Sequence, residues 1–202
     1  MKEPGDDAGG LDAAPVAGVG LGRWLLFWTI ALGGMAFDLG TKSAVFARIG
    51  EPGRSAPVAV IANVLELHTS YNRGALWGLG RELPYSSLFF AGLSVVAAVA
   101  ICWWLFVRKA AADRWLTAAL ALIMAGALGN CYDRLVLGHV RDFVHFHVDP
   151  INFDCAIFNF ADNMLVAGAV ALMLLALRPE PEAEPVRRSP AEPSATGTFP
   201  AR

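Results

Sequence analysis

The sequence predicts an all-α membrane protein with four transmembrane helices and a small extracytoplasmic platform of β-strands. Three observations point to this fold class. Of the 202 residues, 55% are hydrophobic and 17% are charged, whereas soluble domains carry about 25% charged residues. Four apolar runs each approach the roughly 20 residues that cross a bilayer. Between the first two runs, a further stretch alternates in the manner of a strand.

The four helices are predicted at residues 24–46, 85–107, 115–132 and 156–177. The first is interrupted only by Asp38 and Lys42, and the third is short for a membrane span. With their connections they form one membrane domain, residues 23–178. Residues 1–22 and 179–202 flank this domain, and their Gly, Pro, Ala and acidic composition predicts disordered tails.

Two long connections lie on one side of the predicted membrane. Residues 47–84 contain the alternating stretch Val64–Thr69, with turn residues at Pro52-Gly53 and at Asn72-Arg73-Gly74. This pattern favours a small strand platform at the membrane surface. Residues 133–155 hold charged residues and three of the four histidines, together with aromatic residues suited to an interface.

Basic residues near the helix ends indicate the orientation. The tight loop between the second and third helices carries Arg108, Lys109 and Arg114, while Arg23 and Arg178 flank the first and last helices. All five lie on one side, so the positive-inside rule places both termini in the cytoplasm. The net charge of −2, without any Lys/Arg cluster, argues against a nucleic-acid partner.

Acidic residues inside the predicted helices point to function. Asp38 and Asp162 lie eight and six residues from the outer ends of their helices, at depths of roughly 12 Å and roughly 9 Å. A charged group there costs at least ~2.5–3.5 kcal/mol, which makes it a functional candidate by default. Asp38 and Lys42 are four residues apart and predict a structural pair, whereas Asp162 has no basic residue within a turn on its own helix.

More polar residues gather at the outer end of the third helix. Asn130, Asp133 and Arg134 have spacings of three and four, which place them on one helical face. Asp133 is assigned to the structural polar group of Asp38 and Lys42. Two roles stay open for the Asp133-Arg134 step, namely helix-end capping and a substrate contact through Arg134.

The histidines predict no metal site. His145, His147 and Asp149 have a spacing that could hold a metal ion, but no third ligand is evident at a typical spacing. His68 and His139 are not obviously placed to complete a set, so we expect surface histidines and no cofactor. Neither an HExxH nor a GxSxG motif is present, which disfavours a zinc metalloprotease and a serine nucleophile.

The three cysteines predict free thiols. Cys102 falls within a predicted helix, and Cys131 and Cys155 flank one connection. Their spacing forms no recognisable disulfide framework. A disulfide between Cys131 and Cys155 stays open as an alternative, but burial as small apolar side chains is the interpretation that we favour.

Five motifs follow one another along the membrane domain. They begin at Asp38, Asn72, Gly126, Gly138 and Phe158, and their sequences are DLGTK, NRGALWG, GALGNCYDR, GHVRDF and FNFADN. Over residues 24–177 the chain thereby resembles the bacterial lipoprotein signal peptidases, the type II signal peptidases of the cytoplasmic membrane. Departures from the family pattern occur at Leu39, Trp77 and Ala125, and none of them touches an acid.

The resemblance implies an intramembrane aspartic endopeptidase with Asp142 and Asp162 as its catalytic pair. Two carboxylates that share a site hold one proton between them, so one can activate water while the other donates a proton. The residues that the resemblance places around the substrate are Asn72, Asn130, Arg134 and Asn159. The implied substrates are diacylglyceryl-modified prolipoproteins, cut just before the lipidated Cys by a monomeric enzyme among the lipids of the bacterial inner membrane.

Two other classes of function were weighed. A small proton-coupled transporter could use Asp38, Lys42 and Asp162 as a relay. It would be expected to carry an inverted repeat and acids near the midplane, and the sequence shows neither convincingly. A non-catalytic assembly factor with a polar helix interface would tolerate Asp142→Asn far better than a protease would.

Overall fold

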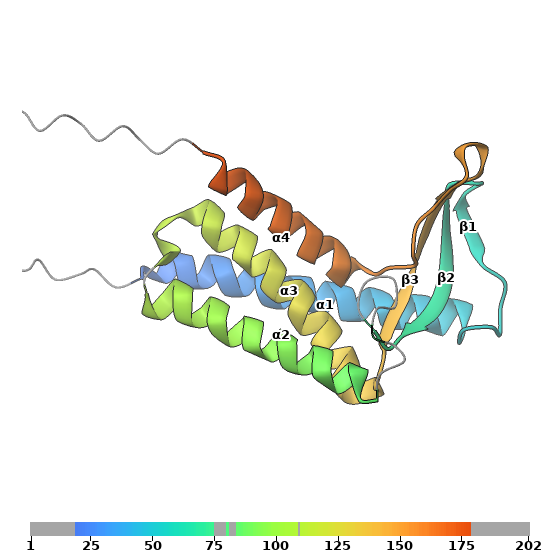
Figure 1. Ribbon diagram of the computed structural model, residues 1–202, viewed down its shortest axis with the longest axis horizontal. Coiled ribbons are helices and arrows are strands. Elements are labelled where there is room, and N and C mark those ends of the chain that lie inside the picture. The colour runs from blue at the N-terminus through green and yellow to red at the C-terminus, as the bar shows by residue number, and fades with distance from the viewer. Residues whose placement is uncertain (1–18, 75–79, 81–83, 109, 179–202) are drawn as a thin grey trace, which may run out of the picture.

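The computed structural model describes residues 19–74, 80, 84–108 and 110–178. It comprises a bundle of helices with a small antiparallel sheet at one end (Figure 1). The helices are α1 (Leu21–Ile49), α2 (Ser86–Cys102), which continues as a π-helical turn (Trp103–Val107), α3 (Arg114–Leu137) and α4 (Phe160–Ala176). The strands are β1 (Val58–Ile61), β2 (Leu65–Asn72), β3 (Val140–Val148) and β4 (Phe153–Asp154). Short 3-10 turns cover Ala110–Ala112 and Asp149–Ile151.

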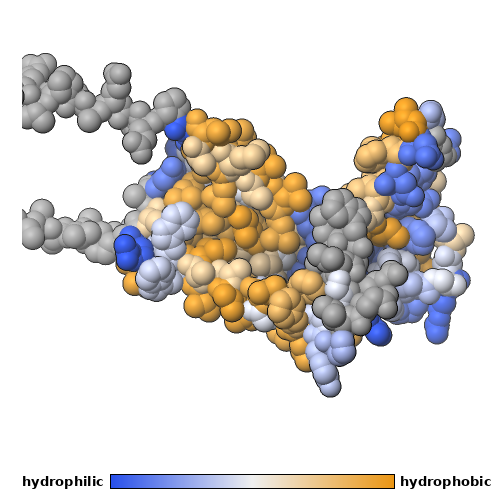
Figure 2. All heavy atoms as spheres, in the orientation of Figure 1, coloured by the Kyte–Doolittle hydropathy of each residue, from blue (hydrophilic) through white to orange (hydrophobic). Residues whose placement is uncertain are grey.

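Three helices are long and apolar enough to cross a membrane: α1, α2 with its π-helical extension, and α3. The remaining helix, α4, is apolar but has 17 residues, the lower limit for a span. The apolar surface of the molecule covers the helical bundle, whereas the sheet end is more hydrophilic (Figure 2). The start of α1 and the end of α4 lie together at the end of the bundle opposite the sheet (Figure 1).

The first helix, predicted at residues 24–46, is three residues longer at each end, and two other predicted helix bounds differ by four or five residues. The last helix starts at Phe160 rather than at residue 156, because Asn159 has extended backbone angles and caps the helix. The third helix runs on to Leu137 rather than ending at residue 132, and it stops at Gly138, whose φ of +76° suits a glycine at a helix C-terminus. The predicted tails lie outside the described residues, except that α1 already begins at Leu21.

The predicted strand platform is present as a four-stranded antiparallel sheet in the order β1-β2-β3-β4. Strand β2 covers the alternating stretch identified in the sequence. Strand β3 lies within the predicted connection at residues 133–155. It pairs with β2 so that Asp142 faces Ser70 and His145 faces Glu66. Strand β3 thereby places Asp142 at the end of the helical bundle that adjoins the sheet.

Helix α3 is the centre of the bundle. In the most apolar 18-residue stretch of each helix, 61% of α3 is buried, compared with 17% of α1. It packs against α1, α2 and α4, and glycines allow the closest approach. A Cβ on Gly126 would meet the Ala161 carbonyl oxygen of α4, and one on Gly129 would lie 2.5 Å from an Asp38 carboxylate oxygen. All three cysteines are free thiols; Cys131 is buried, as expected, whereas Cys102 and Cys155 are only partly buried.

Candidate active site

Asp142 and Asp162 line the same cavity, although they belong to β3 and α4. The cavity has a volume of about 470 Å³ and lies where α3, β3 and the start of α4 meet. Three other polar residues predicted for the site, Asn72, Asn130 and Arg134, line it as well. Its apolar walls are formed by Val140, Ala156, Ile157, Phe158, Leu165 and Val166. A small set of polar groups therefore faces a mainly apolar hollow, as in many sites that bind amphipathic ligands.

Asp142 is buried, with 3% of its surface exposed. One carboxylate oxygen accepts a hydrogen bond from Asn159 Nδ2 at 2.6 Å, and the other accepts one from Asn72 Nδ2 at 3.1 Å. Burial, followed by the nearby charge of Asp162, raises the pKa of Asp142 to about 7, against the lowering effect of the two amide hydrogen bonds. At neutral pH Asp142 therefore holds a proton far more readily than an ordinary aspartate does.

Asp162 lies in the first turn of α4, not two turns inside the helix as the sequence had suggested. Asn159 and Asp162 form a capping box: Asn159 Oδ1 accepts from the Asp162 N–H at 3.0 Å, and Asp162 Oδ2 accepts from the Asn159 N–H at 3.1 Å. The second carboxylate oxygen accepts from Asn130 Nδ2 at 2.8 Å. The helix N-terminus favours the negative charge at this position.

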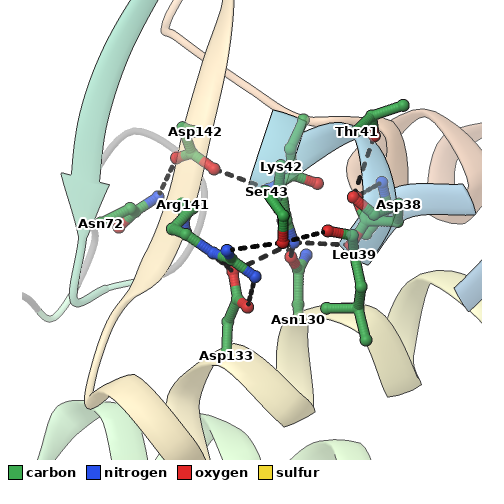
Figure 3. A network of polar contacts seen from close by, with 12 residues as sticks. Asp38, Leu39, Thr41, Lys42, Ser43, Asn72, Asn130, Asp133, Arg141 and Asp142 are labelled. Carbon is green, nitrogen blue, oxygen red and sulfur yellow. Dashed lines mark hydrogen bonds and ion pairs between the residues drawn. The ribbon is translucent and has the colours of Figure 1, made fainter. Parts of the chain in front are cut away.

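Asn130 is oriented by the ammonium group of Lys42. Lys42 Nζ donates to Asn130 Oδ1 at 2.9 Å (Figure 3), and an ammonium group can only donate. The carbonyl oxygen of the Asn130 amide must therefore face Lys42, which leaves the NH₂ group facing Asp162. Asn159 Nδ2 also donates to Asn130 Oδ1 at 3.2 Å, so hydrogen bonds run continuously from Asp142 through the two amides to Asp162.

Lys42 is itself held by two buried acids. Its Nζ lies 2.7 Å from Asp38 Oδ2 and 3.4 Å from Asp133 Oδ2, and all three side chains are fully buried (Figure 3). The other Asp38 oxygen accepts from the Ala161 N–H at 2.8 Å. The contact expected between Asp38 and Lys42 is therefore present, and the bond from the Ala161 N–H to Asp38 connects α1 to the first turn of α4.

Arg141 completes this group and was missed in the sequence. Its guanidinium donates to Asp133 Oδ1 at 2.8 Å, and its backbone N–H donates to Asp133 Oδ2 at 3.0 Å (Figure 3). Successive side chains of a strand point to opposite faces, so Arg141 turns toward α3 while Asp142 turns toward the cavity. The signal was available, since Arg141 directly precedes the predicted acid in a segment with strand-like spacing.

Arg134 faces the cavity rather than the Asp133 network. One guanidinium nitrogen donates to the Gly74 carbonyl oxygen at 3.0 Å, and the group lies 5.5 Å from the centre of the Phe90 ring. Its Nε has no hydrogen-bond partner within the described part of the chain. Of the two roles considered for the Asp133-Arg134 step, helix-end capping does not describe Asp133, whose carboxylate bonds to Arg141 and Lys42.

Comparison with known proteins identifies relatives by sequence and by fold. The family model for signal peptidase (SPase) II matches residues 30–178. A lipoprotein signal peptidase of Rhodopirellula baltica is 38% identical over 198 residues, covering 89% of this chain and 86% of the relative. One from Ralstonia nicotianae is 36% identical over 181 residues, covering 88% and 92%. A solved structure described as a bacterial membrane enzyme superposes with a TM-score of 0.66 at 29% identity, covering 79% of this chain and 90% of that one.

Proposed function

The chain belongs to the signal peptidase II family, and we propose that it is an aspartic endopeptidase with Asp142 and Asp162 as its catalytic pair. Its proposed reaction removes the signal peptide from diacylglyceryl-modified prolipoproteins by cutting just before the lipidated Cys. The observation that supports this most directly is the placement of both acids in one cavity, with each carboxylate oxygen accepting a hydrogen bond from an amide or a backbone N–H.

The two acids have different environments, which suggests separate roles. Asp162 receives the N-terminal field of α4 and acts, in our proposal, as the ionised base that takes a proton from water. Asp142, whose pKa is raised to about 7, carries the proton. It donates this proton to the carbonyl oxygen of the scissile bond as the water oxygen attacks the carbonyl carbon. When the C–N bond breaks, Asp162 gives the proton taken from water to the leaving amine, and Asp142 takes a proton back from the former carbonyl oxygen, which restores both acids.

Substrate binding is assigned to the remaining cavity walls. Arg134 presents guanidinium N–H groups that suit carbonyl oxygens of the peptide or of the ester-linked lipid. Leu165 and Val166 lie on α4 and line the apolar part of the cavity, where a lipid chain could lie without exposure to water. Asn72 and Asn159 both donate a hydrogen bond to Asp142. We therefore assign them the role of positioning this acid beside the scissile carbonyl.

In the proposed membrane arrangement α4 is a fourth span, and the sheet lies at the extracytoplasmic surface. The ends of the helices that carry Arg23, Arg108, Arg114 and Arg178 gather opposite the sheet (Figure 1). The positive-inside rule then supports cytoplasmic termini and an active site that water reaches from outside. We expect residues 23–178 to suffice for a monomeric enzyme. A transporter relay through Lys42 is not favoured, because that ammonium group is fixed between two acids and an amide.

The proposal is tested by cleavage of a purified diacylglyceryl-modified prolipoprotein. Asp142→Asn and Asp162→Asn should each abolish signal-peptide release, whereas Glu51→Gln, at an exposed position, should cleave like the unsubstituted enzyme. Globomycin, the inhibitor associated with this family, should block signal-peptide release by the unsubstituted enzyme and by Glu51→Gln. For the active enzyme, kcat/KM should fall as the pH rises above about 7, because Asp142 loses its proton. Full turnover by either Asn variant would exclude the catalytic pair.

A further inference from the structure

A second cluster of ligating side chains lies on the sheet, outside the cavity just described. Glu66 and His145 are direct partners across β2 and β3, and His68 follows Glu66 by two residues, which puts it on the same face of β2. One ligating atom from each of the three residues lies within 4.8 Å of the other two. Only the folded sheet brings Glu66 and His68 to His145, a proximity that the spacing of these residues in the sequence does not show.

The contacts of His145 show how this cluster is organised. Its Nε2 lies 2.7 Å from Asp154 Oδ1 on β4, and its Nδ1 lies 2.8 Å from Glu66 Oε1. A histidine that binds a metal through one ring nitrogen usually donates its other N–H to a carboxylate, which fixes the tautomer. With the Nε2–H given to Asp154, the Nδ1 lone pair faces the Glu66 oxygen. Either a second ring proton or a metal ion between these two atoms would satisfy both electron pairs.

A third donor reaches the same place. His68 Nδ1 lies 3.7 Å from the same Glu66 oxygen. The donors of a tetrahedral Zn²⁺ site, with Zn–N and Zn–O bonds of about 2.0–2.2 Å, lie ~3.4 Å apart. The present separations lie on either side of that value, so small side-chain rotations would close the site. All three residues are partly exposed, at 41% for His68, 17% for His145 and 21% for Glu66, which leaves the cluster open to an ion from solution.

We propose that Glu66, His68 and His145 bind a divalent transition-metal ion of the Zn²⁺ type, with Asp154 orienting His145 and a fourth position open to water. Two imidazoles and one carboxylate are donors that suit Zn²⁺ rather than Mg²⁺ or Ca²⁺. The ion would join β2 to β3, while Asp154 extends the connection to β4. Because Asp142 lies three residues before His145 on β3, the metal would stabilise the strand that carries it. The role is structural and does not depend on the proposed peptidase chemistry.

The test uses the full-length protein in detergent, without an affinity tag and after removal of metals with a chelator. Titration with Zn²⁺ should show one tight site per chain. The matched control is His139→Gln, since His139 packs on Tyr71 outside the cluster and should leave the titration unchanged. His68→Gln and His145→Gln should remove the site, and Asp154→Asn, which changes only the orienting carboxylate, should weaken it about 10–100-fold.

Two further readouts separate this site from other sources of binding. Zn²⁺ should raise the thermal midpoint of the unsubstituted protein and of His139→Gln, but not that of His68→Gln. X-ray absorption of the zinc-loaded protein should show nitrogen and oxygen donors without sulfur, which excludes the three free cysteines. Equal Zn²⁺ affinity in the unsubstituted protein and His68→Gln, or a sulfur donor, would overturn the proposal. Because His68 is partly exposed, its Gln variant is expected to fold, and a far-UV circular dichroism spectrum verifies this.

Discussion

Replacing Asp142 with Asn should change how the stability of the protein depends on pH. In the folded protein the pKa of Asp142 is raised from 3.8 to about 7, chiefly by burial. The folded state therefore keeps a proton that the unfolded chain releases near pH 3.8. Between these two values unfolding releases protons, so the free energy of unfolding must fall as the pH rises and level off above about 7.

The magnitude follows from the difference between the two pKa values. A difference of about three pH units at 1.36 kcal/mol each corresponds to about 4 kcal/mol as an upper limit. Between pH 4.5 and pH 8.5, about 3 kcal/mol of this should be lost. Asp142→Asn has no proton to release, so its stability should decrease by about 3 kcal/mol less over the same range. Its amide also faces the NH₂ groups of Asn72 and Asn159, which costs about 1–3 kcal/mol, but this cost is the same at both pH values and cancels.

The assay is equilibrium unfolding in mixed micelles at pH 4.5 and 8.5, followed by the fluorescence of the six tryptophans. Glu51→Gln removes an exposed acid and serves as the control, with a pH dependence matching that of the unsubstituted protein. The informative quantity is the difference between the two pH values within each variant. If the stability of Asp142→Asn depends on pH as steeply as that of the control, then Asp142 does not ionise with a raised pKa.

Two further substitutions test the packing that supports the site. Lys42→Met leaves Asp38 buried without a counter-ion, whereas Asp133 keeps its ion pair with Arg141. The free energy of unfolding should therefore fall by about 3–5 kcal/mol. The double variant with Asp38→Asn should recover part of this loss, and a loss below about 1 kcal/mol for Lys42→Met would contradict the buried ion group. Gly126→Ala puts a Cβ against the Ala161 carbonyl and 2.7 Å from a Leu165 carbon, so thermal unfolding should show a loss of about 1–3 kcal/mol. Gly92→Ala, with no atom within 4 Å of the new Cβ, should be neutral or slightly stabilising, and equal effects at the two glycines would refute the close contact.

Apolar runs predicted the helices well, but they could not fix where a helix ends. The run that starts at Ala156 continues into α4, yet residues 156–159 are not helical, because the Asn159 side chain and Asp162 satisfy the first turn of the helix instead. The N-x-x-D spacing that forms this capping box was present in the sequence and outweighs hydrophobicity. With the helix start moved, Asp162 lies at a helix N-terminus and is not an isolated charge at depth.

Contacts between distant strands were the part that the sequence could not supply. The Glu66–His145 pairing depends on the register of β2 and β3, which contains an irregularity between Leu67 and Ser70. A shift of one residue would turn every side chain of a strand to the other face. The same dependence hid Arg141, since its contact with Asp133 requires β3 to run past the end of α3.

The charges around the cavity give a reason for one acid to hold a proton. Around the cavity lie three cations, Lys42, Arg134 and Arg141, and four carboxyl groups, Asp38, Asp133, Asp142 and Asp162. With all four acids ionised, a largely buried cluster would carry a net negative charge, which is costly away from water. Asp38 and Asp133 are bound to cations, and Asp162 has the helix N-terminus. Asp142 has only neutral amide donors and a raised pKa, so we expect the proton that neutralises the cluster to reside there, next to the acid that would activate water in the proposed mechanism.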